Sequence, residues 1–133
     1  MASEPNRLPT DSELAILTVV WARGETTVRE VFEELSASQG MGYTTVLKFM
    51  QIMTGKGLLV RDTTVRPQRY RAAEPKGRTQ RGLVGDLLDR AFAGSAGSLA
   101  LQALSLRKAS PEELRAIREL IDNQITGDGE GDR

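Results

Sequence analysis

Apolar side chains recur at intervals of three or four along much of the first 55 residues, which is the spacing of one helix face. A capping box at Thr10–Glu13 and a glycine at Gly24 mark the start and the end of a first helix. A second helix begins at the Thr27–Glu30 box and ends at the break in residues 39–42. A third amphipathic stretch follows directly, so the pattern predicts three short helices.

The apolar period changes after Gly57 and becomes typical of strands. Two short strands are expected at residues 58–62 and 68–72, and the link between them, which contains Pro67, is short enough for a hairpin. Three short helices followed by a β-hairpin make a winged helix-turn-helix. The predicted fold class is therefore mainly α with a small β-hairpin.

The rest of the chain is predicted to be helical. Residues 74–82 fit a hinge or a poor first helical turn, and apolar stripes follow on both sides of a break at residues 94–97. A capping box at Ser110–Glu113 begins a last helix, which we expect to reach about Gln124. The Gly- and Asp-rich residues 126–133 are expected to be frayed.

A chain of 133 residues fits one domain or two small ones. We divide it into a winged-helix domain at residues 1–75 and a helical region at residues 76–133. With 39% hydrophobic and 27% charged residues, the composition is that of a folded, soluble protein. No apolar run approaches the roughly 20 residues of a membrane span, and the first residues do not form a signal peptide, so we expect a cytoplasmic protein.

The chain contains neither cysteine nor histidine, and this limits the kinds of catalytic and metal-binding sites that it can form. Disulfides, thiolate metal sites and cysteine nucleophiles are excluded, and so are the commonest general base and the commonest transition-metal ligand. Catalysis by Lys or carboxylate side chains remains open, but no pair of such groups is spaced to share a concave face. We therefore expect no enzyme, no cofactor and no metal site.

The net charge of zero conceals a basic middle segment. Residues 43–82 carry nine basic side chains against two acidic ones, a net charge of +7, whereas residues 1–42 and 83–133 carry −4 and −3. Such a distribution is typical of a protein with an anionic partner, although a solvated loop face would produce it as well.

The Gly55-Lys56-Gly57 triplet has some likeness to a phosphate-binding loop, but its context is wrong. A P-loop has its first glycine five positions before the second, and a Lys-Ser or Lys-Thr pair before the helix. Here Met50 occupies that earlier position, and the helix precedes the glycines. Glycines after a helix more simply allow the turn into the next strand.

The third helix has one apolar face and one polar face with a single positive charge. At about 100° per residue, Val46, Phe49, Met50 and Met53 share the side expected to pack on the first two helices. Opposite them lie Thr44, Lys48 and Gln51, with Thr45, Leu47 and Ile52 on the flanks. Lys can read guanine, Gln can read adenine, and Thr can contact a phosphate or a thymine methyl group. The face is therefore predicted to read bases, with a plain solvent-exposed face as the alternative.

The hairpin adds several arginines. If Tyr70 points into the core, Arg69 and Arg71 point outward together, because side chains alternate along a strand. Outward arginines suit phosphate contacts, and a wing that only keeps itself soluble is the alternative. The predicted DNA-contacting residues are Thr44, Thr45, Lys48, Gln51, Lys56, Arg66, Arg69 and Arg71.

The apolar stripes of the C-terminal region need a partner, because three short helices form too small a unit to bury them well. A two-fold contact with a second copy would complete that core, whereas packing onto the same chain's winged helix is the alternative. The predicted dimerisation residues are Leu83, Leu87, Leu88, Phe92, Leu99, Leu104, Leu114, Ile117 and Ile121.

The sequence resembles the BlaI/MecI penicillinase-repressor family of bacterial transcription regulators, which also includes copper-responsive members. The resemblance is carried by "LPTDSELAILTVVW", "TTVREVFEEL", "GYTTVLKFMQIMTGKGLLVRD" and "RPQRYRA", and it spans about residues 8–125. It implies a homodimeric DNA-binding repressor of an inverted-repeat operator, with recognition positions at Thr44, Thr45 and Lys48. It also implies release from DNA by a membrane-bound metallopeptidase sensor that triggers cleavage of the repressor.

The chain departs from the family pattern at several positions. Many relatives carry Arg where this chain has Ile52 and Lys where it has Gly55, which changes the expected operator and affinity. The family's Asn-Phe cleavage pair aligns with Gln102-Ala103. The cysteine metal motif of the copper-responsive relatives is absent from this cysteine-free chain.

Two other functions remain open at this point. The same fold could serve as a protein-interaction module that binds nucleic acid only without sequence preference. A ligand-sensing regulator, with a pocket near Trp21 and the C-terminal helices, is a variant of the repressor prediction, although a Trp at helical spacing is usually a core residue.

Overall fold

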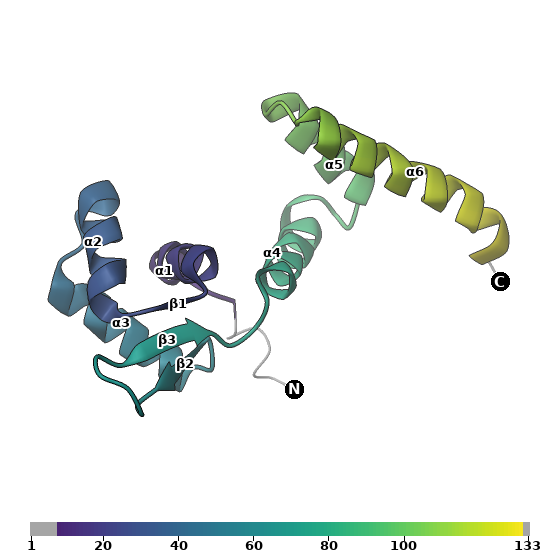
Figure 1. Ribbon diagram of the computed structural model, residues 1–133. Coiled ribbons are helices and arrows are strands. Elements are labelled where there is room, and N and C mark those ends of the chain that lie inside the picture. The colour runs from purple at the N-terminus through teal and green to yellow at the C-terminus, as the bar shows by residue number, and fades with distance from the viewer. Residues whose placement is uncertain (1–7, 132–133) are drawn as a thin grey trace. The chain divides into compact units, whose positions relative to one another are not determined.

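A computed structural model describes residues 8–131, and Figure 1 shows its elements in chain order. These elements are α1 (Asp11–Arg23), β1 (Glu25–Thr26), α2 (Val28–Gln39), α3 (Tyr43–Gly55), β2 (Leu59–Asp62), β3 (Arg69–Ala72), α4 (Lys76–Ala91), α5 (Ala96–Leu106) and α6 (Pro111–Gly131). The chain divides into two compact units with the boundary between Asp86 and Leu87, inside α4. The expected division after residue 75 would place all of α4 in the second part.

The predicted helix starts are confirmed. In the boxes at Thr10–Glu13, Thr27–Glu30 and Ser110–Glu113, the hydroxyl accepts from the backbone N–H of the glutamate. The glutamate carboxylate in turn accepts from the backbone N–H of the first residue, and all these distances lie between 2.8 and 3.3 Å. Each box therefore satisfies two donors that a helix start would otherwise leave unpaired. The first helix ends at Gly24, whose φ of 85° suits a residue without a Cβ.

The strands form a three-stranded antiparallel sheet in the order β1-β3-β2. The expected hairpin of β2 and β3 is confirmed, and Leu59 pairs with Ala72 at its base. The sequence analysis missed β1, because two residues are too short to show any apolar period. Its Thr26 pairs with Tyr70, so β1 exists through pairing with a strand more than 40 positions away.

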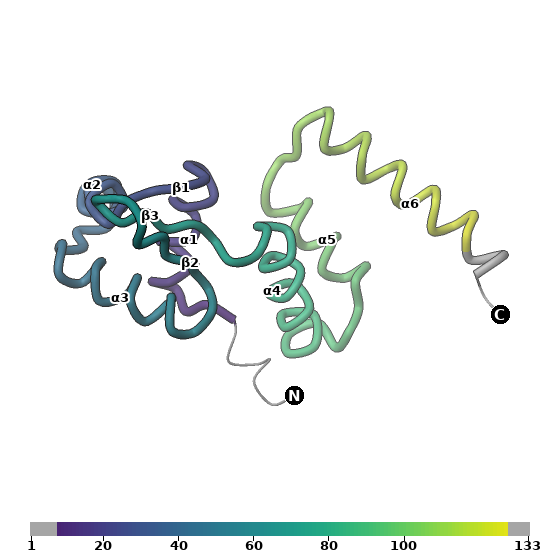
Figure 2. The backbone as a smooth tube through the Cα atoms, turned by 60° about the horizontal axis from the view of Figure 1, so that its bottom comes forward, coloured from purple at the N-terminus to yellow at the C-terminus, as the bar shows by residue number. Residues whose placement is uncertain are grey.

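The buried apolar core lies within α1, α2, α3 and the sheet, which Figure 2 shows side by side. Val46, Met50 and Met53 are fully buried, and Phe49 is packed beside them, as the third helix's apolar face predicts. Tyr70 is buried as well, which confirms that its side of β3 faces the core. The remaining buried apolar residues are Ile16, Leu17, Val19, Val20, Val28, Val31, Leu35 and Leu59.

The C-terminal helices differ from the prediction at two points. The hinge considered for residues 74–82 is helical from Lys76, so the alternative of a first helical turn is correct. The last helix runs to Gly131 instead of about Gln124, although Gly and Asp have low intrinsic helix propensity. The break before α5 is confirmed, with positive φ at Ala93 and Gly94, and residues 132–133 of the expected frayed tail lie outside the described residues.

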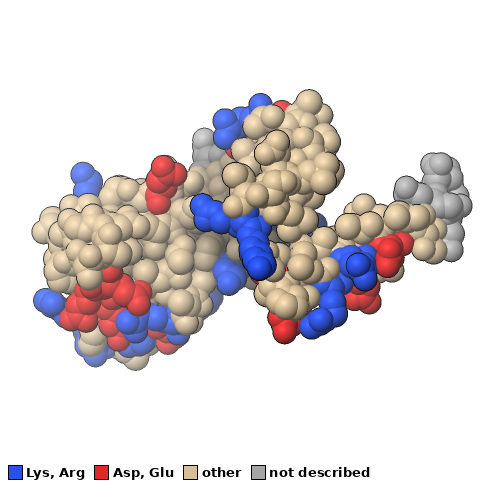
Figure 3. All heavy atoms as spheres, turned by 90° about the horizontal axis from the view of Figure 1, so that it is seen from above, with Lys and Arg blue, Asp and Glu red and all other residues tan. Residues whose placement is uncertain are grey.

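Neither α4 nor α5 contains a buried residue. Figure 3 shows acidic and basic side chains next to each other along one side of α6, while wide areas without charge lie elsewhere on the surface in view. None of the helices in residues 8–131 is long and apolar enough to cross a membrane.

Candidate nucleic-acid interface

The outer face of α3 carries polar side chains, while buried apolar side chains on its opposite face fix the helix in the core. Because Val46, Met50 and Met53 are fully buried, the opposite side of the helix must face solvent. Thr44, Thr45, Lys48 and Gln51 are all exposed there, as predicted. No residue from Tyr43 to Arg61 is acidic, so this surface carries positive charge without internal compensation.

Such a face can do what base recognition in the major groove requires. An α-helix fits that groove, and Lys and Gln present donors and acceptors that match the edges of guanine and adenine. Threonine hydroxyl groups can donate to phosphates or lie against a thymine methyl group.

The first turn of α3 leaves backbone donors available. Its N-cap is Gly42, which has no side chain to accept a hydrogen bond, and the first turn contains no acidic residue. The first N–H groups of a helix lack partners within the helix and favour negative charge, so they are suited to a phosphate.

Beside that turn, Arg29 of α2 lies against two aromatic rings. Its guanidinium carbon is 5.7 Å from the ring centre of Phe32 and 5.5 Å from that of Tyr43, and the two rings meet edge to face at 5.6 Å. These contacts restrain the side chain, and its 3.9 Å ion pair with Glu33 is largely exposed and therefore weak. Arg29 is thus an additional candidate for a phosphate contact.

The sequence analysis missed Arg29 because it lies in the acidic N-terminal segment, outside the basic one. Arg29 lies in the first turn of α2, within the Thr27–Glu30 capping box, and it is the folded chain that brings this turn beside Tyr43 of α3.

Arg66 lies in the hairpin link, directly before residues that line a groove beside α3. Asp62 accepts hydrogen bonds from the backbone N–H and the hydroxyl of Thr64, at 2.9 and 2.6 Å, and so orders the first turn of the link. Pro67 and Gln68, directly after Arg66, line a groove with Tyr43 and Leu47 of α3. Arg66 is exposed, and within the described residues it forms no ion pair with a carboxylate.

Lys56 has a different environment from Lys48. Its ammonium donates to both carboxylate oxygens of the buried Glu13, at 3.0 and 2.9 Å. The pair connects the end of α3 to the first turn of α1, so this predicted DNA contact is occupied by an internal partner.

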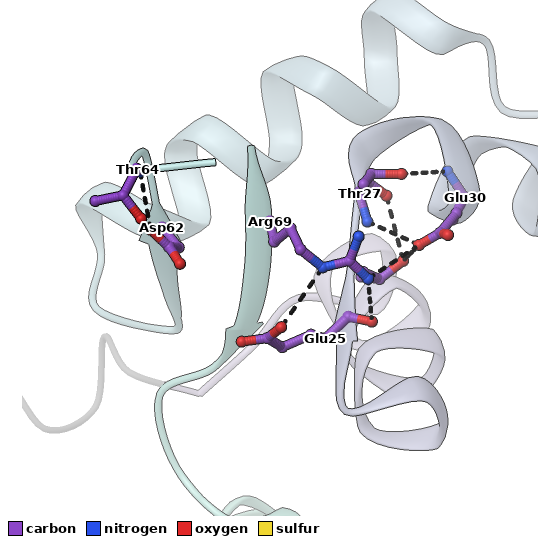
Figure 4. A network of polar contacts seen from close by, with 7 residues as sticks. Glu25, Thr27, Glu30, Asp62, Thr64 and Arg69 are labelled. Atoms are coloured by element: carbon purple, nitrogen blue, oxygen red, sulfur yellow. Dashed lines mark hydrogen bonds and ion pairs between the residues drawn. The ribbon is translucent and has the colours of Figure 1, made fainter. Parts of the chain in front are cut away.

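Arg69 is also engaged by carboxylates, as Figure 4 shows. Its guanidinium lies 3.5 Å from a carboxylate oxygen of Glu25 and 3.9 Å from one of Glu30, and it donates to the carbonyl oxygen of Glu25 at 3.3 Å. A hydrogen bond from the backbone N–H of Thr27, and another from the Thr26 hydroxyl, hold the pKa of Glu30 below its usual value. Arg69 therefore ties the centre of the sheet to β1 and to the start of α2.

Arg71 projects from the outer side of β3, as expected from the burial of Tyr70. It lines a groove with Trp21 and Gly24 at the end of α1, and not the groove beside the start of α3. Of the predicted DNA contacts, the structure thus brings Thr44, Thr45, Lys48 and Gln51 together on α3, and it places Arg71 elsewhere.

The predicted dimerisation residues are half-buried or exposed. Leu104, Leu114, Ile117 and Ile121 line one groove between α5 and α6, with an internal volume of ≈ 450 Å³. Leu87 is exposed, and Leu83, Leu88, Phe92 and Leu99 are half-buried. Other large apolar side chains of these helices, outside the predicted dimerisation set, are exposed as well, namely Val84, Leu101, Leu106, Leu120 and Ile125.

Gln102 and Ala103, the pair that aligns with the family's cleavage site, lie inside α5 and are exposed. The helix that contains this pair, α5, precedes α6 along the chain, as Figure 2 shows. Within residues 8–131, no cluster of acidic side chains could hold a metal ion.

Three helices followed by a hairpin, with the third helix presenting an uncompensated polar and basic face, define a winged helix-turn-helix protein of the DNA-binding class. The sequence pattern of the family described as penicillinase repressor matches residues 9–123. The chain therefore belongs to the penicillinase repressor family, whose members are DNA-binding transcriptional repressors and not enzymes.

The transcriptional regulator BlaI of Mycobacterium tuberculosis strain CDC 1551 / Oshkosh is 30% identical over 120 residues. That alignment covers 90% of this chain and 86% of the relative, and BlaI of strain ATCC 25618 / H37Rv gives the same values. A crystal structure of a MarR family transcriptional regulator from Silicibacter pomeroyi DSS superimposes with a TM-score of 0.46 at 20% identity. It covers 95% of this chain and 75% of the other.

Proposed function

We propose that this protein is a cytoplasmic transcriptional repressor that binds an inverted-repeat operator as a homodimer. The observation that carries the proposal is the outer face of α3, where Thr44, Thr45, Lys48 and Gln51 are exposed on a helix fixed by its buried side. Three of these four side chains are uncharged donors or acceptors, and a surface of this kind can distinguish bases as well as attract phosphates.

Phosphate contacts would come from the groups around the recognition helix. The candidates are the free N–H groups at the start of α3, the guanidinium group of Arg29 beside Tyr43, and that of Arg66, which directly precedes the Pro67 that lines the groove beside α3. These contacts would fix the position of the helix in the groove, while the α3 side chains would read the sequence.

Dimerisation is proposed from the apolar surface of α4, α5 and α6. Neither α4 nor α5 buries a residue, and Leu114 and Ile121 of α6 are about half exposed. Leaving so many large apolar side chains in water is unfavourable, by roughly 25 cal/mol per Å² of apolar surface. A two-fold contact would cover these side chains and provide a second recognition helix about 34–36 Å away, or at a multiple of that distance.

The family resemblance extends the proposal to induction. Cleavage at Gln102–Ala103, triggered by a membrane-bound metallopeptidase sensor, would separate α6 from the rest of the chain and so remove part of the proposed dimer surface. The bond lies within a helix, so α5 would have to open locally before a protease could bind it in an extended form.

The recognition face is tested by Lys48→Ala and Thr45→Val, measured against the operator and against random duplexes of equal length. Loss of one good base contact weakens binding by about 1–3 kcal/mol, so we expect roughly a tenfold or greater loss for the operator. The variants should remain dimers in sedimentation experiments. Unchanged operator affinity in both variants would contradict the assignment of α3.

A further inference from the structure

One large aliphatic side chain is exposed on the outer side of the recognition helix. Ile52 is 41% exposed, although isoleucine is among the residue types most often fully buried. Across residues 8–75, the exposed large apolar side chains belong to α3 or to the hairpin and its link: Tyr43, Ile52, Val60 and Val65. Of these four, Tyr43 and Ile52 lie on α3 itself, at its first residue and near its end.

The position of Ile52 on the helix places it among the reading residues. It follows Lys48 by four positions, so the two side chains are neighbours on one face. It follows Thr45 by seven positions, or nearly two whole turns, and the two lie almost on one line about 10 Å apart. Since base pairs along a strand are spaced by about 3.4 Å, this line spans roughly three base steps.

The major groove offers one kind of apolar group, the C5-methyl group of thymine. The other base edges in that groove are hydrogen-bond donors and acceptors, and covering them with an aliphatic side chain would leave them unpaired. An exposed isoleucine next to a base-reading lysine therefore favours thymine over the other three bases at the position that it contacts.

We propose that Ile52 is a specificity-determining residue that recognises the methyl group of one thymine in each operator half-site. The inference rests on the proposed function, because it requires α3 to lie in the major groove. Removing the contact would expose about one methyl group's worth of apolar surface, which corresponds to an affinity change of about fourfold per half-site.

The test uses the full-length protein and an operator obtained by selection from random duplexes. Each thymine of one half-site is replaced in turn by deoxyuridine, which removes the methyl group and keeps every hydrogen-bonding atom. Binding is measured for the wild type, for Ile52→Ala and for Ile52→Val. The matched control is Val60→Ala, which trims an apolar side chain of similar exposure on the hairpin.

We expect one thymine per half-site whose replacement weakens wild-type binding by about fourfold. Ile52→Ala should bind the thymine and uracil duplexes equally at that position, Ile52→Val should retain part of the difference, and Val60→Ala should retain all of it. Because Ile52 is exposed, thermal melting of the variants should be close to that of the wild type.

The other outcomes overturn the inference in distinguishable ways. An operator without any methyl-sensitive thymine, or a methyl effect that persists in Ile52→Ala, contradicts the role of Ile52 and leaves the repressor function in place. A change of oligomeric mass in Ile52→Ala would mean that Ile52 contacts a second copy of the chain instead of DNA. Failure to select any operator would refute the proposed function itself.

Discussion

Glu13 is a carboxylate with only 3% of its side chain exposed, and its environment explains why it is tolerated. Burial by itself would raise the pKa of Glu13, but hydrogen bonds from Lys56 and Thr10, together with attraction to the Lys56 charge, outweigh it. The pKa of Glu13 therefore lies below its ordinary value of 4.5. The same carboxylate completes the capping box of α1 and holds the end of α3, so one residue joins two helices.

We expect Lys56→Ala to lower the free energy of unfolding by about 3 kcal/mol, because it leaves a buried carboxylate without its partner. Urea denaturation at neutral pH measures this change. Lys48→Ala is the matched control on the same helix, and it should change stability by no more than about 0.5 kcal/mol because Lys48 is exposed. Equal stability of the two variants would show that the Glu13–Lys56 pair contributes nothing to the fold.

The lowered pKa of Glu13 also predicts a pH dependence. A carboxyl group that binds its proton less readily in the folded state stabilises the protein above its unfolded-state pKa, and this contribution is lost as pH falls through the folded-state pKa. The stability difference between wild type and Glu13→Gln should therefore be largest near neutral pH and shrink below pH 4.5. Urea denaturation across this range measures it, and a difference that grows on acidification would contradict the assignment.

Two arginines of the hairpin, Arg66 and Arg69, differ in whether carboxylates neutralise their charge. Arg69 lies between Glu25 and Glu30, which neutralise its charge and fix β3 against β1 and α2. Arg66 lies in the link between the strands, without a carboxylate partner among the described residues. Only the unpaired charge should release a full counterion from DNA.

We therefore expect Arg66→Ala to reduce the slope of log K against log salt by about 0.9 per protomer, or about 1.8 for the proposed dimer, since one phosphate contact is lost in each half-site. Arg69→Ala should lower affinity with a smaller change of slope, since its carboxylate partners already compensate the charge. Binding titrations at several salt concentrations separate the two effects. An equal loss of slope in both variants would mean that Arg69 contacts phosphate directly.

The parts of the fold that depend on the spacing of nearby side chains could be predicted from the sequence. The capping boxes, the buried face of α3 and the hairpin all follow from side-chain spacing, and the structure confirms them. The partners of Lys56 and Arg69 could not be predicted, because Glu13 and Glu25 are each more than 40 positions away and meet them only in the folded chain. The same holds for β1, which exists only through its pairing with β3.

At the scale of the whole molecule, the two units differ in how they are stabilised. The first has a core formed by three helices and the sheet, whereas large apolar side chains of α5 and α6, such as Leu101 and Ile121, are exposed. A charge placed in the groove between α5 and α6 should be costly if a second copy covers it.

We predict that Ile121→Glu converts the proposed dimer to a monomer and weakens operator binding by at least about tenfold, since each monomer then holds a single half-site. Sedimentation velocity reports the mass. Asn123→Asp adds the same charge on the opposite face of α6 and should remain dimeric. Two monomeric variants would indicate a general effect of charge on α6, and two dimeric ones would place the interface elsewhere.

The most direct test is selection of bound duplexes from a random pool by the full-length protein at two salt concentrations. A dimer that reads bases through α3 should enrich an inverted repeat whose half-site centres are about one helical turn, or a multiple of a turn, apart. The enrichment should persist at the higher salt concentration, where phosphate contacts alone are weakened. Weak enrichment without a repeat, together with a steep loss of binding at higher salt, would contradict sequence reading by this protein.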